Sequence, residues 1–328
     1  MASKLKGYLS EAGELPRDIL LGHVGIYAIA DNPTISPEEL EKRYANLGLD
    51  PKRLPNSIKP INAFEKATQS INGTNWTMAD GTTATLLCRE VVNDRGAMTR
   101  HLVREVRDGA NVRLRHDTVA ELIFYKAVAK DAGRDEGTQV PRFTAWPHAM
   151  ADEELPHVQE ALLAIRNAYA QMTQFYDGQA LRRTVRSYML ALDGIELKGS
   201  VYFVPVEQAD TVEKIAELLN DIGNGTEMQL MPLVDLPKQR TWVVEKFQTE
   251  SVEKLKKLAG ECNRVMNTRK TITGDAYLKL KNEYDEVLAQ ATRYQKLTKG
   301  SMDYTAGAAE FALDVLGELQ TRMITQED

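Results

Sequence analysis

The chain has 328 residues, a formal net charge of −6 and a pI of about 5.6, with 43% hydrophobic and 27% charged residues. This apolar content excludes wholesale disorder, and a single core rarely grows past about 250–300 residues, so two or more structural units are expected. The mild acidic excess disfavours non-specific binding to nucleic acid or to anionic membranes.

Two cysteines, Cys88 and Cys262, are too few for a disulfide framework, and no C-x-x-C pair suggests a zinc site. The first residues, MASKLKGYLSEAGELPRD, lack the apolar core of a signal peptide, and no run of 18 apolar residues occurs. The sequence therefore predicts a cytoplasmic protein with two free thiols and no membrane partner.

The first part of the chain, residues 1–72, reads as a helical unit. Ser36 and Pro37 form a helix start, because Ser caps the first turn and Pro suits the first helical position. Residues 61–71 predict another helix. The glycine-interrupted apolar run 17–30 fits either a short helix or a buried strand.

Residues 73–150 predict a mainly antiparallel β unit. Residues 101–107 and 112–116 flank a Gly-containing turn and read as a hairpin, which would make His101 and His116 cross-strand neighbours. Alternation places Val112 and Leu114 on the inward face of that hairpin. Residues 98–106 also fit a helix, because Met98, Leu102 and Val106 are four residues apart; a strand is preferred.

Residues 151–236 combine two amphipathic helices, about 155–176 and 179–192, with a strand–helix–strand unit. In that unit, strands at 199–205 and 227–233 flank a helix that ends near residue 219.

Residues 237–328 predict an antiparallel helical hairpin or bundle. The predicted interaction seam repeats apolar residues at coiled-coil spacing, and comprises Leu255, Leu258, Val265, Tyr284 and Val287. A third helix over about 303–323 would close it through Phe311, Val315 and Leu319. The fold class expected for the whole chain is α+β. The seam has two interpretations, internal packing or an interface for another chain.

Common catalytic and nucleotide-binding signatures are absent from the sequence, so no catalytic residue, metal or cofactor is predicted. His148 and His157 flank an acidic loop, Asp152 to Glu154, where a metal is conceivable. A solvated helix start, whose dipole favours acidic residues, is the preferred interpretation of that loop.

Arginines are concentrated in the predicted hairpin, and guanidinium groups bind phosphate in a bidentate manner. The candidate nucleic-acid-binding residues are Arg100, Arg104, Arg107, Arg113 and Arg115. The interleaved acids Glu105, Asp108 and Asp117 favour a salt-bridged surface instead. There are two interpretations of Arg182, Arg183 and Arg186: a second basic patch, or the solvated face of a helix.

Two stretches, HLVREVRDGANVRLRHDTVAELIFY (101–125) and GSVYFVPVEQADTVEKIAELL (199–219), are similar to segments of functionally uncharacterised bacterial and bacteriophage proteins. The resemblance implies no activity and assigns no role to any residue, although it suggests a phage or mobile-element origin.

The favoured function is a non-catalytic binding or assembly protein, with a protein partner or self-association through the helical hairpin. One alternative is a nucleic-acid-associated protein that uses the Arg-rich hairpin. The other alternative is an enzyme, for which His101, His116 and Arg113 are the first candidates.

Overall fold

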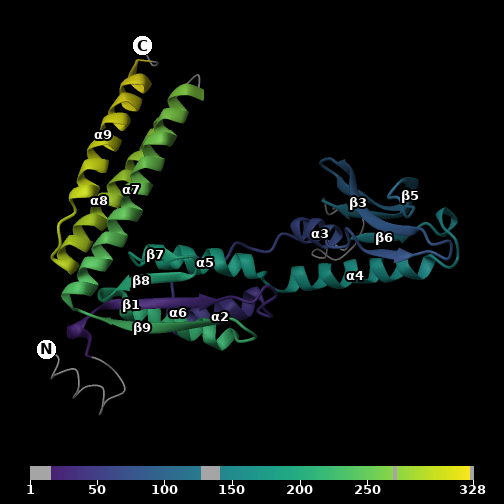
Figure 1. The fold of residues 1–328 in the computed structure, drawn as a ribbon, viewed down its shortest axis with the longest axis horizontal. Coiled ribbons are helices and arrows are strands. Elements are labelled where there is room, and N and C mark those ends of the chain that lie inside the picture. Colours follow the sequence, from purple (N-terminus) through teal and green to yellow (C-terminus); the bar gives the residue numbers. More distant parts are fainter. Residues whose placement is uncertain (1–15, 127–140, 269–271, 326–328) are drawn as a thin grey trace, which may run out of the picture. The chain divides into compact units, whose positions relative to one another are not determined.

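A computed structural model describes residues 16–126, 141–268 and 272–325, and Figure 1 shows the course of the chain. The helices are α2 (Pro37–Leu47), α3 (Pro60–Gln69), α4 (Leu155–Gln174), α5 (Gly178–Ala191), α6 (Ala209–Ile222), α7 (Pro237–Thr268), α8 (Gly274–Thr298) and α9 (Asp303–Ile324). The strands are β1 (Leu20–Ala28), β2 (Asn75–Thr77), β3 (Thr83–Asn93), β4 (Ala97–Arg107), β5 (Arg113–Tyr125), β6 (Arg142–Ala145), β7 (Ile195–Lys198), β8 (Val201–Pro205) and β9 (Glu227–Val234). The predicted α+β class is confirmed. None of the described helices combines the length and apolar content needed to cross a membrane.

The chain folds into two compact units, each assembled from non-consecutive stretches. Among the described residues, the first unit comprises 16–31, 41–54, 181–268 and 272–325, and the second comprises 32–40, 55–126 and 141–180. This division differs from the four consecutive segments expected from the sequence. The physical reason is β1, which pairs with β8 and β9, about 175 to 215 residues further along the chain. A wholly helical unit over residues 1–72 therefore does not hold for Leu20–Ala28.

The sheet of the first unit has the strand order β7-β8-β1-β9. Because β8 and β9 each run antiparallel to β1, they are parallel to one another. Helix α6 connects them and packs mainly on β9, so the predicted strand–helix–strand unit is present as a split β-α-β motif with β1 inserted.

The outer edge of this sheet is blocked along β9. The Asn220 amide occupies both backbone groups of Met228, accepting from its N–H (2.9 Å) and donating to its carbonyl oxygen (3.2 Å). Pro232, two positions beyond Leu230, has no N–H to offer. Such an edge resists the addition of a further strand.

Helices α7, α8 and α9 form a three-helix bundle in the first unit (Figure 1). Helices α7 and α8 are consecutive and antiparallel, as predicted, and part of their connection, 269–271, lies outside the described residues. Helix α9 runs parallel to α7, because Tyr304 N donates to Gln248 Oε1 near one end and Arg322 donates to the Met266 carbonyl near the other.

The bundle joins its sheet through a buried aromatic cluster. Phe247 of α7 stacks on Tyr294 of α8 at 4.4 Å, and Tyr294 meets Phe203 of β8 edge-on. The Tyr294 hydroxyl donates to the Asp193 carbonyl oxygen at 2.6 Å. Burial raises the pKa of Tyr294 well above its usual value, so this hydroxyl stays a donor.

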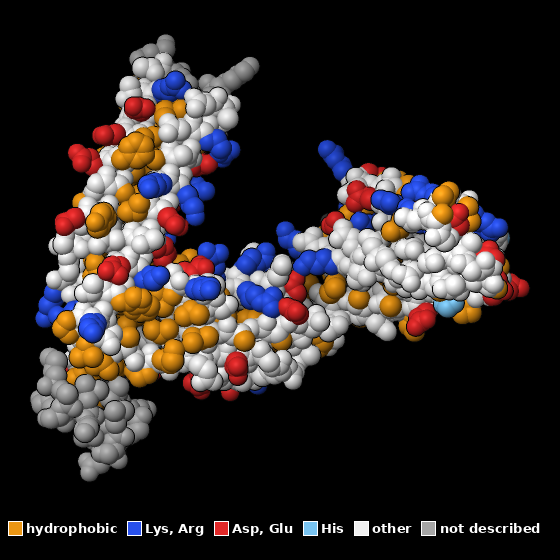
Figure 2. Space-filling view, viewed as in Figure 1, with side chains coloured by type: hydrophobic (Ala, Val, Ile, Leu, Met, Phe, Trp, Pro, Cys, Tyr) orange, Lys and Arg blue, Asp and Glu red, His pale blue; other side chains and the backbone are white. Residues whose placement is uncertain are grey.

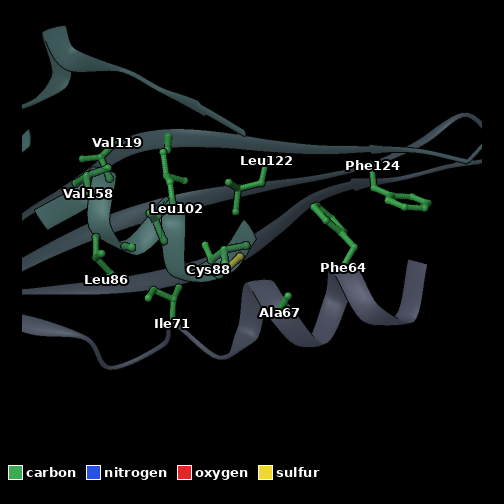
Figure 3. Close-up of a cluster of buried hydrophobic side chains, with 14 of the residues drawn as sticks. Phe64, Ala67, Ile71, Leu86, Cys88, Leu102, Val119, Leu122, Phe124 and Val158 are labelled. Atoms are coloured by element: carbon green, nitrogen blue, oxygen red, sulfur yellow. The ribbon is translucent and has the colours of Figure 1, made fainter. Parts of the chain in front are cut away.

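The second unit is a five-stranded antiparallel sheet, in the order β2-β3-β4-β5-β6, with α3 and α4 on one face. Figure 3 shows its core, in which Phe64 of α3 lies beside Phe124 and Val158 of α4 lies beside Val119 of the sheet. The β4–β5 hairpin and the strand over residues 98–106 are confirmed.

Two details of the hairpin prediction are wrong. His101 lies opposite Glu121 and His116 opposite Glu105, so the two histidines are not cross-strand neighbours. Val112 and Leu114 are exposed, because they lie at the tip of the hairpin, beyond the core under α3 and α4. Counted from the Arg107↔Arg113 pair at the turn, even a regular hairpin would place Val119 opposite His101, and the register shifts move that partner on to Glu121.

Candidate functional site

Two arginines of β4, Arg100 and Arg104, point inward rather than towards solvent. Arg100 is buried and donates to the Glu65 carbonyl oxygen (3.0 Å) and to Thr68 Oγ1 (2.6 Å) of α3. Arg104 is 2% exposed and is paired with Glu154 and with Asp117, the latter at 2.8 Å. Both guanidinium groups belong to the packing between the sheet and its helices, so they cannot form a phosphate-reading surface.

The remaining hairpin arginines are largely neutralised locally. Arg107 and Arg113 both pair with Glu105, at 2.6 and 2.7 Å. The hydrogen bond from Arg107 is the main reason that the pKa of Glu105 lies below its usual value. Arg115 is exposed and has no ion pair in the described part of the chain. Only one of the five predicted phosphate ligands is therefore both exposed and unpaired.

The sheet face opposite α3 and α4 carries a row of polar residues. Strand register aligns Arg89, His101, Glu121 and Thr144 across four strands. His101 Nε2 is 3.9 Å from Glu121 Oε1, beyond hydrogen-bond range, so the carboxylate does not orient the imidazole as a general base. His116 and Arg113 gather instead around Glu105, roughly 13 Å along β4 from His101. The predicted enzymatic residues thus do not converge on one site.

The two histidines that flank the acidic loop have separate aromatic partners. His157 stacks on Trp76 at 4.9 Å, and His148 stacks on Trp146 at 6.2 Å. Within residues 16–126, 141–268 and 272–325, no group of three His, Cys, Asp or Glu side chains is arranged to hold a metal ion.

The second basic patch is dispersed. Arg182 donates to the Ile29 carbonyl oxygen and pairs with Asp31, both at 2.6 Å. Arg186 pairs with Glu196 at 3.0 Å, while Arg183 is exposed. Two of the three charges therefore have local partners, as on an ordinary solvated helix face.

The predicted seam of the helical hairpin is internal. Leu255, Leu258 and Val265 of α7 and Tyr284 and Val287 of α8 are buried in one cluster. Helix α9 completes this cluster with the residues Ala309, Ala312, Val315, Leu316 and Leu319. The bundle thus buries its own seam, and a partner would have to bind elsewhere on its surface.

Phe311 is the exception to the predicted closure, since its side chain is 55% exposed. The inward face of α9 is centred on the small residue Ala312, which allows close helix packing and turns Phe311 outward. Tyr304 is 78% exposed and lies seven residues earlier, hence on the same side of the helix. The sequence reasoning missed Tyr304, although its seven-residue spacing from Phe311 was a visible signal.

Tyr304 lines a groove between α7 and α9, which we call the α7–α9 groove. Its volume is about 430 Å³, and its lining residues are Glu245, Gln248, Thr249, Val252, Glu253, Lys256 and Tyr304. Gln248 fixes the start of α9, because it accepts from Tyr304 N (3.0 Å) and donates to the Ser301 carbonyl oxygen (3.3 Å). The Gln248 side chain therefore ties the start of α9 to α7 beside the groove.

The exposed surface of α9 is acidic. Asp303, Glu310, Asp314 and Glu318 are exposed, and the first basic residue of the helix is Arg322. None of these four carboxylates has an ion pair with a described residue. Figure 2 shows acidic side chains along one edge of this helix with hydrophobic side chains next to them.

Fold and groove together define an α+β protein with a self-closed helical bundle that exposes aromatic side chains on one flank. The chain belongs to a family of unknown function, DUF6744, whose model matches residues 20–326. No curated protein and no solved structure matches the chain.

Proposed function

We propose that this chain is a non-catalytic binding or assembly protein that holds a protein partner in the α7–α9 groove. The observation that carries the proposal is the exposure of Tyr304 (78%) and Phe311 (55%) on a bundle whose core is otherwise closed. Tyrosine is among the residues that most often dominate the energetics of protein interfaces, and aromatic side chains are enriched there.

The two exposed aromatic residues of α9 lie outside the buried cluster of α7, α8 and α9. Among the described hydrogen bonds, the one that joins Tyr304 to α7 is made by its backbone N–H and not by its side chain. Truncating such a side chain costs the bundle little, whereas truncating an interface anchor typically costs binding about 1–2 kcal/mol or more.

Nucleic-acid binding receives less support from the geometry, because Arg100 and Arg104 are buried and Arg107 and Arg113 share Glu105. An enzymatic role receives less support as well, because His101 lies apart from His116 and Arg113. A cytoplasmic location and a phage or mobile-element origin stay predictions from the sequence.

The test compares two exposed positions of one helix. Tyr304→Ser with Phe311→Ser removes the two exposed aromatic side chains, of which Tyr304 lines the groove, and Leu313→Ser is the matched control, since Leu313 is 48% exposed but points to the opposite side of α9. Each tagged full-length chain is purified from its host, and the co-purifying proteins are identified by mass spectrometry. Circular dichroism melting verifies that all variants remain folded.

The proposal expects one or more proteins that co-purify with the wild type and the Leu313→Ser variant but are lost from the double variant. A dimer that the double variant dissociates, seen by light scattering, would identify a second copy as the partner. Equal recovery of every protein by all three chains, together with unchanged monomers, would overturn the proposal.

A further inference from the structure

A pocket of about 520 Å³ lies between α7 and α8, and we call it the α7–α8 pocket. The two helices form its walls, and Leu190 and Asp193, at the end of α5 and just beyond it, close one end. All of its lining residues belong to the first unit, and none of them lines the α7–α9 groove. What binds here is therefore a separate question from what binds in the groove.

The floor of the α7–α8 pocket is apolar. Leu258 of α7 and Val287 of α8 form it as members of the bundle core, where they are 5% and 8% exposed. Leu190 adds a partly buried apolar wall. Small-molecule sites typically have volumes of about 300–1,000 Å³ and combine an apolar lining with a few placed polar groups. The pocket thus has the size and the floor to receive the apolar body of a small ligand.

A buried amide supplies one polar group of the pocket. Gln290 of α8 lines the pocket and is 7% exposed. Its Nε2 donates to the Asp193 carbonyl oxygen at 3.2 Å, which fixes the orientation of the amide. Its Oε1 accepts from none of the described residues. Because buried polar groups are normally satisfied, this acceptor is suited to an N–H group of a bound molecule.

The two walls of the pocket carry opposite charges. Lys254 and Lys257 lie one turn apart on the α7 wall. Glu286 and Gln290 lie one turn apart on the α8 wall. Lys254 pairs with Glu250 at 2.7 Å, whereas Lys257 and Glu286 form no ion pair with each other or with another described residue. Two opposite charges therefore face the same pocket without neutralising one another.

The remaining charged lining residues have partners outside the pocket. These partners are Arg264 for Glu261, Lys279 for Glu283 and Arg293 for Asp193. The charges left for a ligand are one cation, Lys257, and one anion, Glu286, on opposite walls. A purely anionic or purely cationic ligand would satisfy one of them and be repelled by the other.

We propose that the α7–α8 pocket binds a small zwitterion with an apolar body, such as a dipeptide with free ends. The carboxylate of the ligand meets Lys257, and its ammonium group meets Glu286 and the Oε1 atom of Gln290. The apolar body lies on Leu258 and Val287. This arrangement pairs both free charges and the open acceptor, and it covers the apolar floor.

Three dipeptides that differ only at their ends test this assignment. Leucyl-leucine has both charges, N-acetyl-leucyl-leucine lacks the ammonium group, and leucyl-leucine amide lacks the carboxylate. Each is titrated into the full-length chain at about 50 mM salt, where exposed ion pairs are weakly screened, and ligand-observed NMR measures the dissociation constant. For leucyl-leucine we expect a dissociation constant on the order of 1 mM or below.

Leucyl-leucine should bind about threefold more tightly than either blocked dipeptide, because an exposed ion pair accounts for a factor of roughly two to three. Lys257→Gln should weaken the binding of both dipeptides that keep the carboxylate and leave that of the amide unchanged. Glu286→Gln should weaken the binding of both dipeptides that keep the ammonium group and leave that of the acetylated one unchanged. Leu190→Trp, which places a larger side chain in the pocket, should prevent binding of all three.

Lys256→Gln is the matched control, because Lys256 is an exposed neighbour on α7 that lines the α7–α9 groove instead. It should leave the binding of every dipeptide unchanged, and circular dichroism melting verifies that all variants remain folded. Any of three results would overturn the proposal: no binding of leucyl-leucine at about ten times the expected dissociation constant, equal affinity of the three dipeptides, or equal losses from Lys256→Gln and Lys257→Gln. The recovery of host proteins by the Tyr304→Ser, Phe311→Ser chain is measured separately, so either proposal can fail alone.

Discussion

Glu154 is expected to be the most sensitive charged position of the second unit. Its carboxylate is 2% exposed, pairs with Arg104 and accepts from Ala151 N at 3.1 Å at the start of α4. Removing one partner of a buried ion pair typically destabilises a protein by about 3–5 kcal/mol, because the other charge is left without compensation. Asp117 still contacts Arg104 at 2.8 Å, so we expect Glu154→Gln to cost about 2–3 kcal/mol.

A double substitution separates the loss of the charge from the loss of the packing. Arg104→Met alone should destabilise by a similar amount, since it leaves Glu154 buried and uncompensated. Arg104→Met combined with Glu154→Leu should recover most of that loss, because replacing a buried ion pair with apolar side chains of similar volume is close to neutral. Glu153→Gln, at the exposed neighbouring position, should change the free energy of unfolding by less than about 0.5 kcal/mol.

Urea unfolding followed by tryptophan fluorescence measures these changes. The chain has three tryptophans, and Trp242→Phe leaves Trp76 and Trp146, both in the second unit, as reporters. A Glu154→Gln midpoint equal to that of Glu153→Gln would refute the reasoning. The reasoning would also be refuted if the double variant lost as much free energy of unfolding as its two single substitutions together. Both single losses have the same cause, a buried charge left without its partner, so they should not add.

Two further outcomes follow from burial in the bundle and the second unit. Burial raises the pKa of Cys88, and raises that of Cys262 to about 11. Both thiols should therefore react slowly with a disulfide reagent at pH 8 and rapidly in denaturant. Because both cysteines are free, the melting temperature should not change when reductant is added. Since the folded pKa of Cys262 exceeds its unfolded value near 9, its contribution to stability should be complete below pH 9 and decline as the pH rises through about 11; fast native labelling would contradict both statements. Deleting residues 303–328 removes Val315, Leu316 and Leu319 from the buried cluster and should cause aggregation visible by light scattering, whereas a truncated chain that stays monodisperse would show that α7 and α8 do not need α9.

Most of the local structure could be predicted from the sequence, because helix starts and buried helix faces depend on residues that are close together in the chain. Ser36, whose hydroxyl accepts from Glu39 N at 3.2 Å, and Pro37 mark the start of α2 as predicted. The 3-4-3 apolar spacing of Leu255, Leu258, Cys262 and Val265 correctly predicted the buried face of α7. The ambiguity over residues 98–106 also has a local cause, because a four-residue apolar repeat is compatible with a period of two. In β4, Arg100 and Arg104 occupy the inward positions between Met98, Leu102 and Val106.

Only the tertiary structure decided which charges are free and which apolar residues are exposed. An arginine in a strand is expected at the surface unless a carboxylate from a distant segment pairs with it. Glu154, the partner of Arg104, lies 50 residues away in the sequence. Likewise, Phe311, Val315 and Leu319 fit one helical stripe, but close packing around Ala312 rotates that stripe until Phe311 leaves the core. Pairing and packing across long sequence separations depend on the partner surface, which no periodicity within a single segment encodes.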